Sequence, residues 1–415
     1  IRQKKVKEHN IMKCGIMYYK ETDNIGDDIQ TYTALRFLPH IDYYIDREDL
    51  NCFIPKEKEY VSMIMNGWYI HNKAAWPPSP YINPLLMSMH FTRLEKIDVG
   101  EKYLQGLGGE YLKKYEPIGC RDVETQKRLS NNGIENYFSG CMTLTIQKFE
   151  DVKKEDYICL VDLDKNSADL VKQNTNREIK EITHWLDPKE TVKKTFEERM
   201  NEVEKILKTY QGAHVVFTNR LHVALPCIAL GTPVVLIHKE KYEEDRLGTF
   251  LKYMTSYTDV EFTKLNINEI IENPKDNNEE YLQIRNDLEK RCKEFIKKAE
   301  EKTDIENLPD IEEYKKYVDK ISWYKDLYED VRVKAKNNLY ESDKKYQEYI
   351  AENSKIWAEY QNCKKELEEY KEKYKETEDK CKSIEIEKEK LKQEIDNIYN
   401  SKSWKYLNKM RNIKN

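Results

Sequence analysis

The stretch 218-TNRLHVALPCIALGTPVVLI-237 places an apolar helix between two apolar strands, and this arrangement decides the fold class. The segments 213-AHVVFT-218 and 233-PVVLIH-238 are short and rich in β-branched residues, as strands buried on both faces are. Gly231 and Pro233 are residue types that end a helix and open the next element. The stretch therefore predicts one strand–helix–strand unit of a parallel sheet.

The start of this helix carries an arginine and a histidine. Thr218 and Asn219 are predicted to cap the helix, which puts Arg220 and His222 in its first turn. Because the N-terminus of a helix favours a bound anion, we expect Arg220 to oppose helix stability until an anion is present. His222 can exchange a proton near neutral pH, although a histidine in a helix is usually only packed there. We interpret the pair as a candidate anion site.

Strand-like segments and helical patterns alternate up to about residue 300, and the charged stretch 150-EDVKKED-156 divides them into two blocks. This alternation predicts an α/β fold with two Rossmann-like domains facing a cleft. Ligands bind such sheets at the carboxyl ends of the strands. The predicted strands are 12–19, 61–68, 117–120 and 135–139 in the first block and 157–163, 178–183, 213–218 and 233–238 in the second.

Beyond about residue 309 the chain is dominated by lysine, glutamate and tyrosine. Side chains from Tyr346 to Ile398 recur at alternating spacings of three and four, which is the heptad pattern of a coiled coil. Asn353 and Lys388 stand at core positions and are expected to set the register, whereas a single helix held by Glu–Lys pairs is the alternative. The predicted divisions of the chain are an extension at 1–10, an N-terminal domain at 11–150, a C-terminal domain at 151–305, a coiled coil at 309–400 and a tail at 401–415.

Composition narrows the function classes. Of the 415 residues 39% are apolar and 35% are charged, and the net charge of −5 gives no indication of nucleic-acid binding. The nine cysteines form no CxxC pair, so we predict no zinc site and expect buried thiols in a reducing cytoplasm. No apolar run reaches the ~18 residues of a membrane span, and no signal peptide opens the chain. Since the first residue is Ile1, we expect the sequence to be part of a longer chain.

The loop after the first predicted strand contains Asn24, Gly26, Asp27 and Asp28 just before a helix. Gly26 permits a tight turn or the close approach of a ligand. Asp27 or Asp28 can cap the helix, and either carboxylate can accept hydrogen bonds from sugar hydroxyls or act as a general base. The loop is therefore a candidate substrate site.

Further candidates follow other predicted strands. Trp68 begins a proline-rich aromatic loop and can stack on a sugar, with packing between layers as the alternative. Arg121 follows a short strand and can hold a carboxylate or phosphate, or else pair with Asp122, the predicted cap of the next helix. At the same edge of the second sheet as Arg220, the predicted substrate-binding residues are His184, Lys239 and Arg246.

Three motifs resemble the polysaccharide pyruvyl transferase family: NIGDD (Asn24 to Asp28), GCRD (Gly119 to Asp122) and, above all, TNRLHVALPCIALGTPVVLI. The resemblance covers roughly residues 11–255. Members of this family are similar in architecture to the two-domain GT-B glycosyltransferases. They transfer the enolpyruvyl unit of phosphoenolpyruvate onto two hydroxyls of one sugar, which forms a cyclic ketal and releases phosphate.

The resemblance implies phosphoenolpyruvate as a co-substrate, no further cofactor and no metal. It also implies a glycan or lipid-linked sugar acceptor on the N-terminal domain, in bacterial surface-glycan biosynthesis. By motif, Arg220 and His222 match positions for donor binding and proton transfer, and Arg121 matches a second basic residue. We expect His222 to be the general acid, with Asp27 or Asp28 as the base. The alternatives are a GT-B-like glycosyltransferase that uses a sugar nucleotide and an inactive scaffold that assembles partners.

The segment 401-SKSWKYLNKMRNIK-414 resembles the tail of many bacterial surface-polysaccharide glycosyltransferases. It combines basic and apolar side chains, so we expect it either to touch the inner face of the cell membrane or to dock on a partner. The coiled coil is expected to form a homo-oligomer. The predicted location is the cytoplasm, with peripheral contact at the membrane through the tail.

Overall fold

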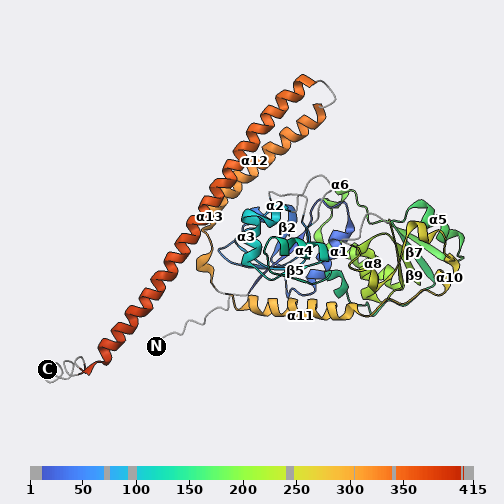
Figure 1. Cartoon of the computed structure of the whole chain (residues 1–415), viewed down its shortest axis with the longest axis horizontal. Coiled ribbons are helices and arrows are strands. Elements are labelled where there is room, and N and C mark those ends of the chain that lie inside the picture. Colours follow the sequence, from blue (N-terminus) through green and yellow to red (C-terminus); the bar gives the residue numbers. More distant parts are fainter. Residues whose placement is uncertain are drawn as a thin grey trace. The chain divides into compact units, whose positions relative to one another are not determined.

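The computed structural model describes residues 12–69, 75–91, 101–239, 247–302, 304–338, 343–402 and 405. The chain divides into two compact units, one ending at Ile305 and the other beginning at Glu306. Figure 1 shows that the first unit is built from two sheets with their helices and that the second is a pair of long helices. The predicted α/β fold with two Rossmann-like sheets and a long C-terminal helix is confirmed.

The first sheet has six parallel strands in the order β2-β1-β3-β4-β5-β6. Strand β3 is buried along nearly its whole length, which is typical of a strand covered on both faces. The strands are β1 (Lys13–Tyr18), β2 (Tyr43–Asp46), β3 (Val61–Trp68), β4 (Ile82–His90), β5 (Ile118–Cys120) and β6 (Asn136–Phe138). The helices are α1 (Ile25–Leu35), η1 (Arg47–Cys52), α2 (Glu101–Leu104), α3 (Gly106–Lys114), α4 (Val123–Asn131) and η3 (Met142–Thr145).

Strand β4 corrects the sequence prediction of a long aromatic loop after Trp68. Its segment contains Pro84, a residue type that is normally confined to edge strands because it has no N–H to donate. Pro84 pairs with Met63 of β3, whereas β4 pairs with β5 at Met89. The proline is therefore tolerated where the strand has a neighbour on one side.

The second sheet has five parallel strands in the order β11-β10-β9-β7-β8. The strands are β7 (Tyr157–Val161), β8 (Glu178–Ile182), β9 (Val215–Thr218), β10 (Val234–His238) and β11 (Thr255–Thr258). The helices are α5 (Lys165–Gln173), α6 (Pro188–Thr191), α7 (Phe196–Gly212), α8 (Leu221–Leu230), η4 (Leu251–Tyr253), α9 (Asp259–Phe262), α10 (Ile267–Glu272) and α11 (Tyr281–Glu300). The short helix η5 (Ile305–Asn307) lies at the boundary between the two units. Helix α11 returns to the first sheet, where Leu288 and Cys292 share a core with Ile16 and Ile64.

Helix α8 is the element that the opening stretch predicts. All its residues are buried except His222, which is half-buried. Gly231 has a φ of 71° and ends the helix, since the left-handed conformation lets the Thr232 N–H bond to the Cys227 carbonyl at 2.9 Å. The apolar side chains of α8 form one core with Ile25 and Ile29 of α1, so the two sheets share a common interior.

A buried ion pair also joins the two halves of this unit. Asp28 on α1 faces Arg199 on α7, with Nη2 at 2.5 Å from Oδ1 and Nε at 3.1 Å from Oδ2. Arg199 Nη2 also donates to the carbonyl of Tyr19 at 2.7 Å. Burial raises the pKa of Asp28 to about 6, although the Arg199 guanidinium acts in the opposite direction.

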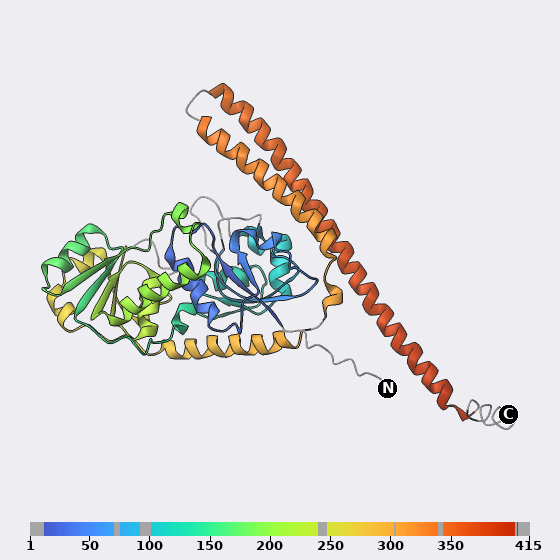
Figure 2. The same ribbon diagram turned by 180° about the vertical axis from the view of Figure 1, so that it is seen from behind.

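The second unit is a pair of long helices, α12 (Ile311–Asn338) and α13 (Asp343–Asn400), which lie side by side in both views (Figures 1 and 2). They run in opposite directions, since Lys320 bonds to Glu366 at 2.6 Å and the ring of Tyr317 lies 4.8 Å from that of Tyr370. Part of the predicted heptad pattern therefore packs within the chain. The buried side chains of this pairing are Tyr314, Val318, Ile321, Tyr360, Cys363 and Leu367.

Most of the predicted tail, residues 403–404 and 406–415, lies outside the described residues. Among the helices that the structure describes, none is both long enough and apolar enough to cross a membrane.

The ion pair between Asp28 and Arg199 predicts strong coupling between the two residues. Asp28→Ala or Arg199→Ala leaves one buried charge without its partner and is expected to lower the free energy of unfolding by about 3–5 kcal/mol. The double variant is expected to lose clearly less than the sum of the two, as measured by urea unfolding. Losses that simply add would contradict the coupling.

Candidate functional site

A pocket of about 540 Å³ lies within the first unit, where the carboxyl ends of strands from both sheets meet. The polar groups in its wall follow β1, β5, β7, β9 and β10, as expected for ligand sites in parallel sheets. The lining residues are Asn24, Asp27, Gln30, Trp68, Arg121, Asp162, Asp164, Trp185, Asn219, Arg220, Leu221, His222, Ile237, His238, Lys239 and Asp259.

The loop between β1 and α1 joins the two sheets at this pocket. The N–H of Ile25 donates to the carbonyl of His184 at 3.0 Å, and the N–H of Leu186 donates to the carbonyl of Asp23 at 2.7 Å. Asn24 caps α1, because its side chain accepts from the N–H of Gly26 at 3.0 Å. The prediction that Asp27 or Asp28 caps this helix is therefore wrong.

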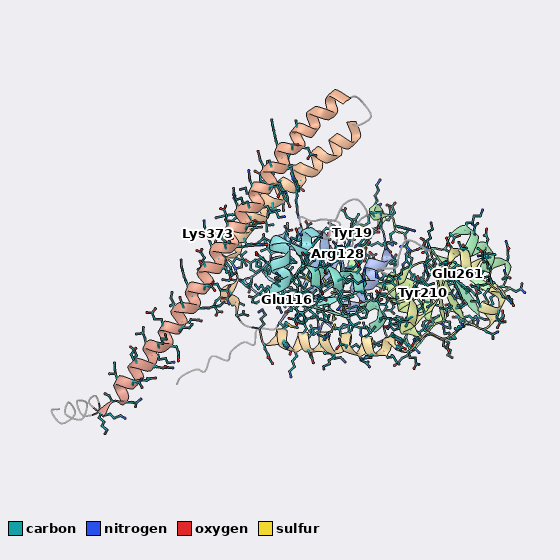
Figure 3. The ribbon with its side chains drawn as sticks, viewed as in Figure 1. Tyr19, Glu116, Arg128, Tyr210, Glu261 and Lys373 are labelled. Atoms are coloured by element: carbon teal, nitrogen blue, oxygen red, sulfur yellow. The ribbon has the colours of Figure 1, made fainter. Side chains whose placement is uncertain are left out.

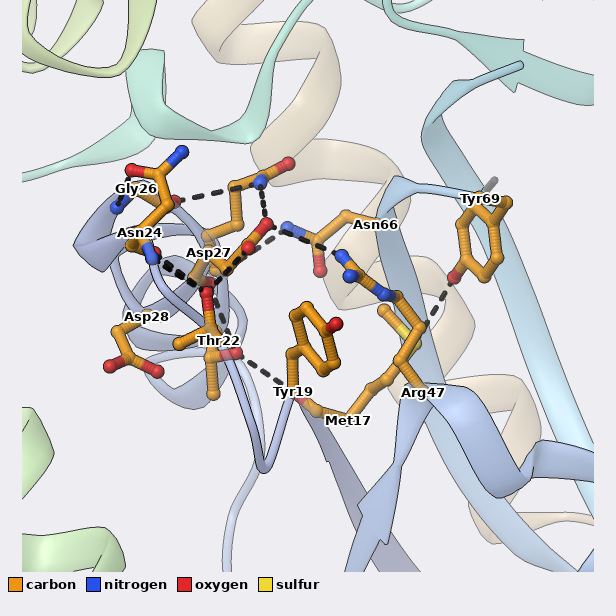
Figure 4. Close-up of polar contacts among 12 residues, drawn as sticks. Met17, Tyr19, Thr22, Asn24, Gly26, Asp27, Asp28, Arg47, Asn66 and Tyr69 are labelled. Atoms are coloured by element: carbon orange, nitrogen blue, oxygen red, sulfur yellow. Dashed lines mark hydrogen bonds and ion pairs between the residues drawn. The ribbon is translucent and has the colours of Figure 1, made fainter. Parts of the chain in front are cut away.

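Asp27 and Asp28 are adjacent but have different surroundings (Figure 4). Asp27 lines the pocket and accepts from the Thr22 hydroxyl at 2.8 Å and from Arg47 Nη1 at 3.3 Å. Asp28 is outside the lining and pairs with Arg199. Successive helix positions differ by about 100° around the axis, so only one of two adjacent acids can face the pocket. Asp28 therefore does not face the pocket and is not a candidate base.

A chain of polar contacts continues from Asp27 along the pocket wall. Gln30 lies between Asp27 and Arg121, with Nε2 at 3.5 Å from Asp27 Oδ1 and Oε1 at 3.3 Å from Arg121 Nη1. The Arg121 side chain is only 2% exposed, and Nε lies 3.8 Å from Asp122. The Arg121 guanidinium is therefore held in one orientation at the pocket.

Asp122 caps α4 as predicted, accepting from the Thr125 N–H at 2.9 Å. It also contacts His90 Nδ1 at 2.5 Å. Burial alone would raise the pKa of Asp122, but His90 and Arg121 hold it at about 2. Asp122 is thus a charged support behind Arg121.

Arg220 is the N-cap residue of α8, and no side-chain bond caps the helix. The prediction of Thr218 and Asn219 as caps is therefore wrong. Arg220 Nε lies 2.5 Å from Asp162, and its guanidinium stacks on the Trp185 ring at 4.4 Å. The expectation that Arg220 opposes the helix until an anion binds is also wrong, because Asp162 already balances its charge.

Asp162 is held in place by the backbone and by its own bonds. It has a φ of 51°, which is unusual for a residue with a side chain and is often found at functional sites. Its carboxylate accepts from the Thr183 hydroxyl at 2.8 Å and from the His184 N–H at 2.9 Å. Arg220 is therefore oriented by a rigid acid at the end of β7.

His222 lies in the first turn of α8 and lines the same pocket. Gly26 packs against it so closely that an added Cβ would lie 2.9 Å from Nδ1 and 3.2 Å from the His222 Cβ. The absence of a side chain at Gly26 therefore makes room for the imidazole. Trp68 and Lys239 also line the pocket, as the sequence predicts.

His184 and Arg246 differ from the other predicted substrate-binding residues. His184 is outside the pocket lining and is fully buried. Its Nε2 lies 2.6 Å from the hydroxyl of Tyr210, which is labelled in Figure 3. The pKa of His184 is lowered to about 3, mainly by burial and in addition by the positive charge of Arg220. The prediction of a substrate-binding side chain is therefore wrong, and this side chain packs inside the fold. Arg246 lies outside the described residues.

Several pocket residues were absent from the sequence prediction. Asp162 ends a strand that was predicted, so its position after 157-YICLV-161 was a usable signal. Gln30 lies one helical turn beyond Gly26, on the face of α1 that meets the pocket. Arg47 lies in η1, outside the pocket lining, and contacts Asp27, but no local sequence pattern connects the two residues.

Comparisons with known proteins show the family of the chain. The family model described as polysaccharide pyruvyl transferase matches residues 24–237, slightly more than half of the chain. The comparison with curated proteins found no match.

Solved structures with similar chains include three that the alignments cover almost completely. A protein of uncharacterised function from Klebsiella pneumoniae is 15% identical with a TM-score of 0.33, and the match covers 59% of this chain and 90% of that one. UDP-GlcNAc 2-epimerase from Methanocaldococcus jannaschii is 13% identical with a TM-score of 0.40, and the match covers 69% of this chain and 99% of that one. A heptosyltransferase of E. coli is 12% identical with a TM-score of 0.25, and the match covers 66% of this chain and 99% of that one.

The buried histidine predicts a pH dependence of stability. The pKa of His184 is about 3 in the folded protein and about 6.5 in an unfolded chain, so stability is complete above pH 6.5 and is lost as the pH falls below it. Between pH 7.5 and 4.5 the unmodified protein is expected to lose about 2–3 kcal/mol more than His184→Gln, as measured by urea unfolding. His40→Gln, at a half-exposed histidine, is the control, and equal losses in all three proteins would contradict the assignment.

The contact between Gly26 and His222 predicts a local effect of a single methyl group. Gly26→Ala is compatible with the helical backbone but forces the imidazole of His222 to move. The side-chain NMR signals of His222, assigned by their loss in His222→Gln, are expected to shift. Unchanged His222 signals would show that the imidazole does not pack on Gly26.

Proposed function

Because the chain belongs to the polysaccharide pyruvyl transferase family, we propose that it transfers the enolpyruvyl group of phosphoenolpyruvate onto two hydroxyls of one sugar. The observation that carries the proposal is that Arg220, Arg121 and His222 line one pocket at the carboxyl ends of two parallel sheets. The acceptor is a bacterial surface glycan or its lipid-linked precursor, and the reaction takes place in the cytoplasm at the inner face of the membrane.

The anionic donor matches the cations in the pocket wall. Phosphoenolpyruvate carries a carboxylate and a phosphate, and both suit planar guanidinium groups and the N-terminus of a helix. Arg220 uses Nε to bind Asp162, and a guanidinium has four further N–H donors. Arg121 and Lys239 supply two more positive charges in the same wall. We assign the donor to the space before α8.

The protons of the reaction balance within the site. The methylene carbon C3 gains one proton, C2 becomes electrophilic, and the oxygen of the first sugar hydroxyl forms a bond to C2. The bond between C2 and the phosphate oxygen then breaks, and the second hydroxyl oxygen closes the ketal. Of the two hydroxyl protons, one restores the acid that protonated C3 and the other leaves on the released phosphate. His222 lines the pocket and is the residue to which we assign the transfer to C3.

Asp27 is the carboxylate best placed to receive a proton from the acceptor. Its side chain is 13% exposed and is fixed by Thr22 and Arg47, so one geometry is maintained. The acceptor sugar can stack on Trp68 from the first sheet or on Trp185 from the second, and the Trp185 side chain is 61% exposed. The acceptor therefore lies between the two halves of the pocket.

Binding of the donor tests the proposal without the acceptor. Phosphoenolpyruvate is expected to raise the melting temperature, since a ligand at 100 times its Kd stabilises a protein by about 2.7 kcal/mol. Arg220→Ala is expected to abolish this rise in melting temperature. In cells that carry the variant, mass spectrometry should show a surface glycan without its pyruvyl ketal. Stabilisation by sugar nucleotides alone, with a missing sugar in the glycan, would favour a glycosyltransferase. A glycan unaltered by Arg220→Ala would favour the scaffold.

Substitution of the proposed acid and base is expected to lower kcat and to leave donor binding intact. His222→Gln should reduce kcat by about 10²–10⁴-fold, since general acid–base groups typically contribute this much. Asp27→Asn should reduce kcat by about 10²-fold or more for the same reason. The measurement is phosphate release from phosphoenolpyruvate in the presence of glycan acceptor. His40→Gln is the matched control, and equal rates for it and His222→Gln would contradict the assignment.

A further inference from the structure

The C-terminal part of α13 exposes an apolar stripe. Helix α12 begins at Ile311. Because Lys320 lies opposite Glu366 in this antiparallel pair, Ile311 lies opposite about residue 375 of α13. Past that point the heptad positions Ile384, Leu391 and Ile395 are 61%, 52% and 50% exposed. Figure 3 shows this end of α13 with side chains projecting from a lone helix.

We propose that the segment from Lys380 to Ile398 pairs with the same segment of a second copy of this chain, as a parallel, in-register coiled coil. The stripe repeats at core positions, and Ile398 completes it at 56% exposed. Since the stripe is continuous with the seam that α12 covers, the same heptad pattern serves both pairings. The remaining question is which partner and which orientation the flanking charges select.

Charge complementarity selects the second copy in parallel orientation. A heptad has two core positions, a and d. In a parallel coiled coil the residue directly before the a position of one helix faces the residue five places further along the partner helix. Lys380 then faces Glu385 of the second copy, and Glu387 faces Lys392. Both pairs join opposite charges, and each occurs twice in the dimer.

The opposite orientation is disfavoured by the same residues. An antiparallel pairing that overlaps the whole stripe places equivalent flanking positions against each other. Glu387 then faces Glu387 or Glu394 of the second copy, and only part of the opposite-charge contacts of the parallel pair remains. Like charges at such positions weaken a coiled coil. Parallel alignment also stacks Lys388 on Lys388 in one core layer, and a lysine at such a position specifies register and oligomer state.

The mass of the full-length protein in solution tests the pairing. Sedimentation analysis is expected to give twice the chain mass of 49.8 kDa at micromolar concentration. Leu391→Lys combined with Ile395→Lys should give a monomer, because it puts charges in the seam. Ile386→Lys is the matched control, since Ile386 is 60% exposed but lies off the stripe, and it should remain a dimer. A monomer in the unmodified protein, or a dimer that the seam variant leaves intact, would overturn the proposal.

Orientation is tested by charge reversal and by cross-linking. Glu387→Lys should weaken the dimer at least tenfold, and adding Lys392→Glu should restore it. Cys381 is the exposed cysteine of the chain and stands at a core position, so a parallel pair brings the two thiols within disulfide reach. Mild oxidation should then give a covalent dimer that Cys381→Ser abolishes. A dimer that forms no such cross-link, or a charge reversal without effect, would refute the parallel register.

Discussion

The joint between the β1–α1 loop and the loop after β8 is the constraint on which the site depends. Two backbone hydrogen bonds, Ile25 to His184 at 3.0 Å and Leu186 to Asp23 at 2.7 Å, hold the carboxyl ends of the two sheets together. The buried pair of Asp28 and Arg199 fixes the same helix from its other side. Because of this joint, Gly26 of α1 packs on His222 of α8, and two motifs that are distant in the sequence meet at the pocket.

Electrostatic preorganisation follows from that geometry. Each arginine of the pocket has its own acid: Arg220 has Asp162 at 2.5 Å, and Arg121 has Asp122 at 3.8 Å. These acids lower the cost of burying the guanidinium groups and fix where their remaining donors point. Fixed donors favour a ligand with two separate anionic groups over a diffuse negative charge. The proposed donor, with one carboxylate and one phosphate, has this character.

The sequence was sufficient where the information is local. Alternating apolar strands and helices predicted the two parallel sheets, and the position of Arg121, Arg220 and His222 after strands predicted their common pocket. It failed where tertiary contacts decide. Asp27 and Asp28 look alike in the sequence, but the rotation of the helix sends one to the pocket and the other to Arg199.

Other failures have similar causes. His184 follows a strand as a ligand residue would, yet its ring packs on Tyr210 inside the fold. Pro84 concealed strand β4, since prolines normally exclude a central strand. The heptad pattern predicted a seam in the C-terminal helix but could not show that α12 covers part of it.

The most direct test of the central claim follows the donor carbon itself. Phosphoenolpyruvate labelled with ¹³C at C2 is incubated with the protein and with surface glycan isolated from cells that lack it, and NMR records the labelled carbon. We predict that the enol signal is replaced by a ketal signal attached to the glycan, with one phosphate released per ketal, and that His222→Gln suppresses the change. A labelled donor that stays intact while a sugar nucleotide is consumed would contradict the account.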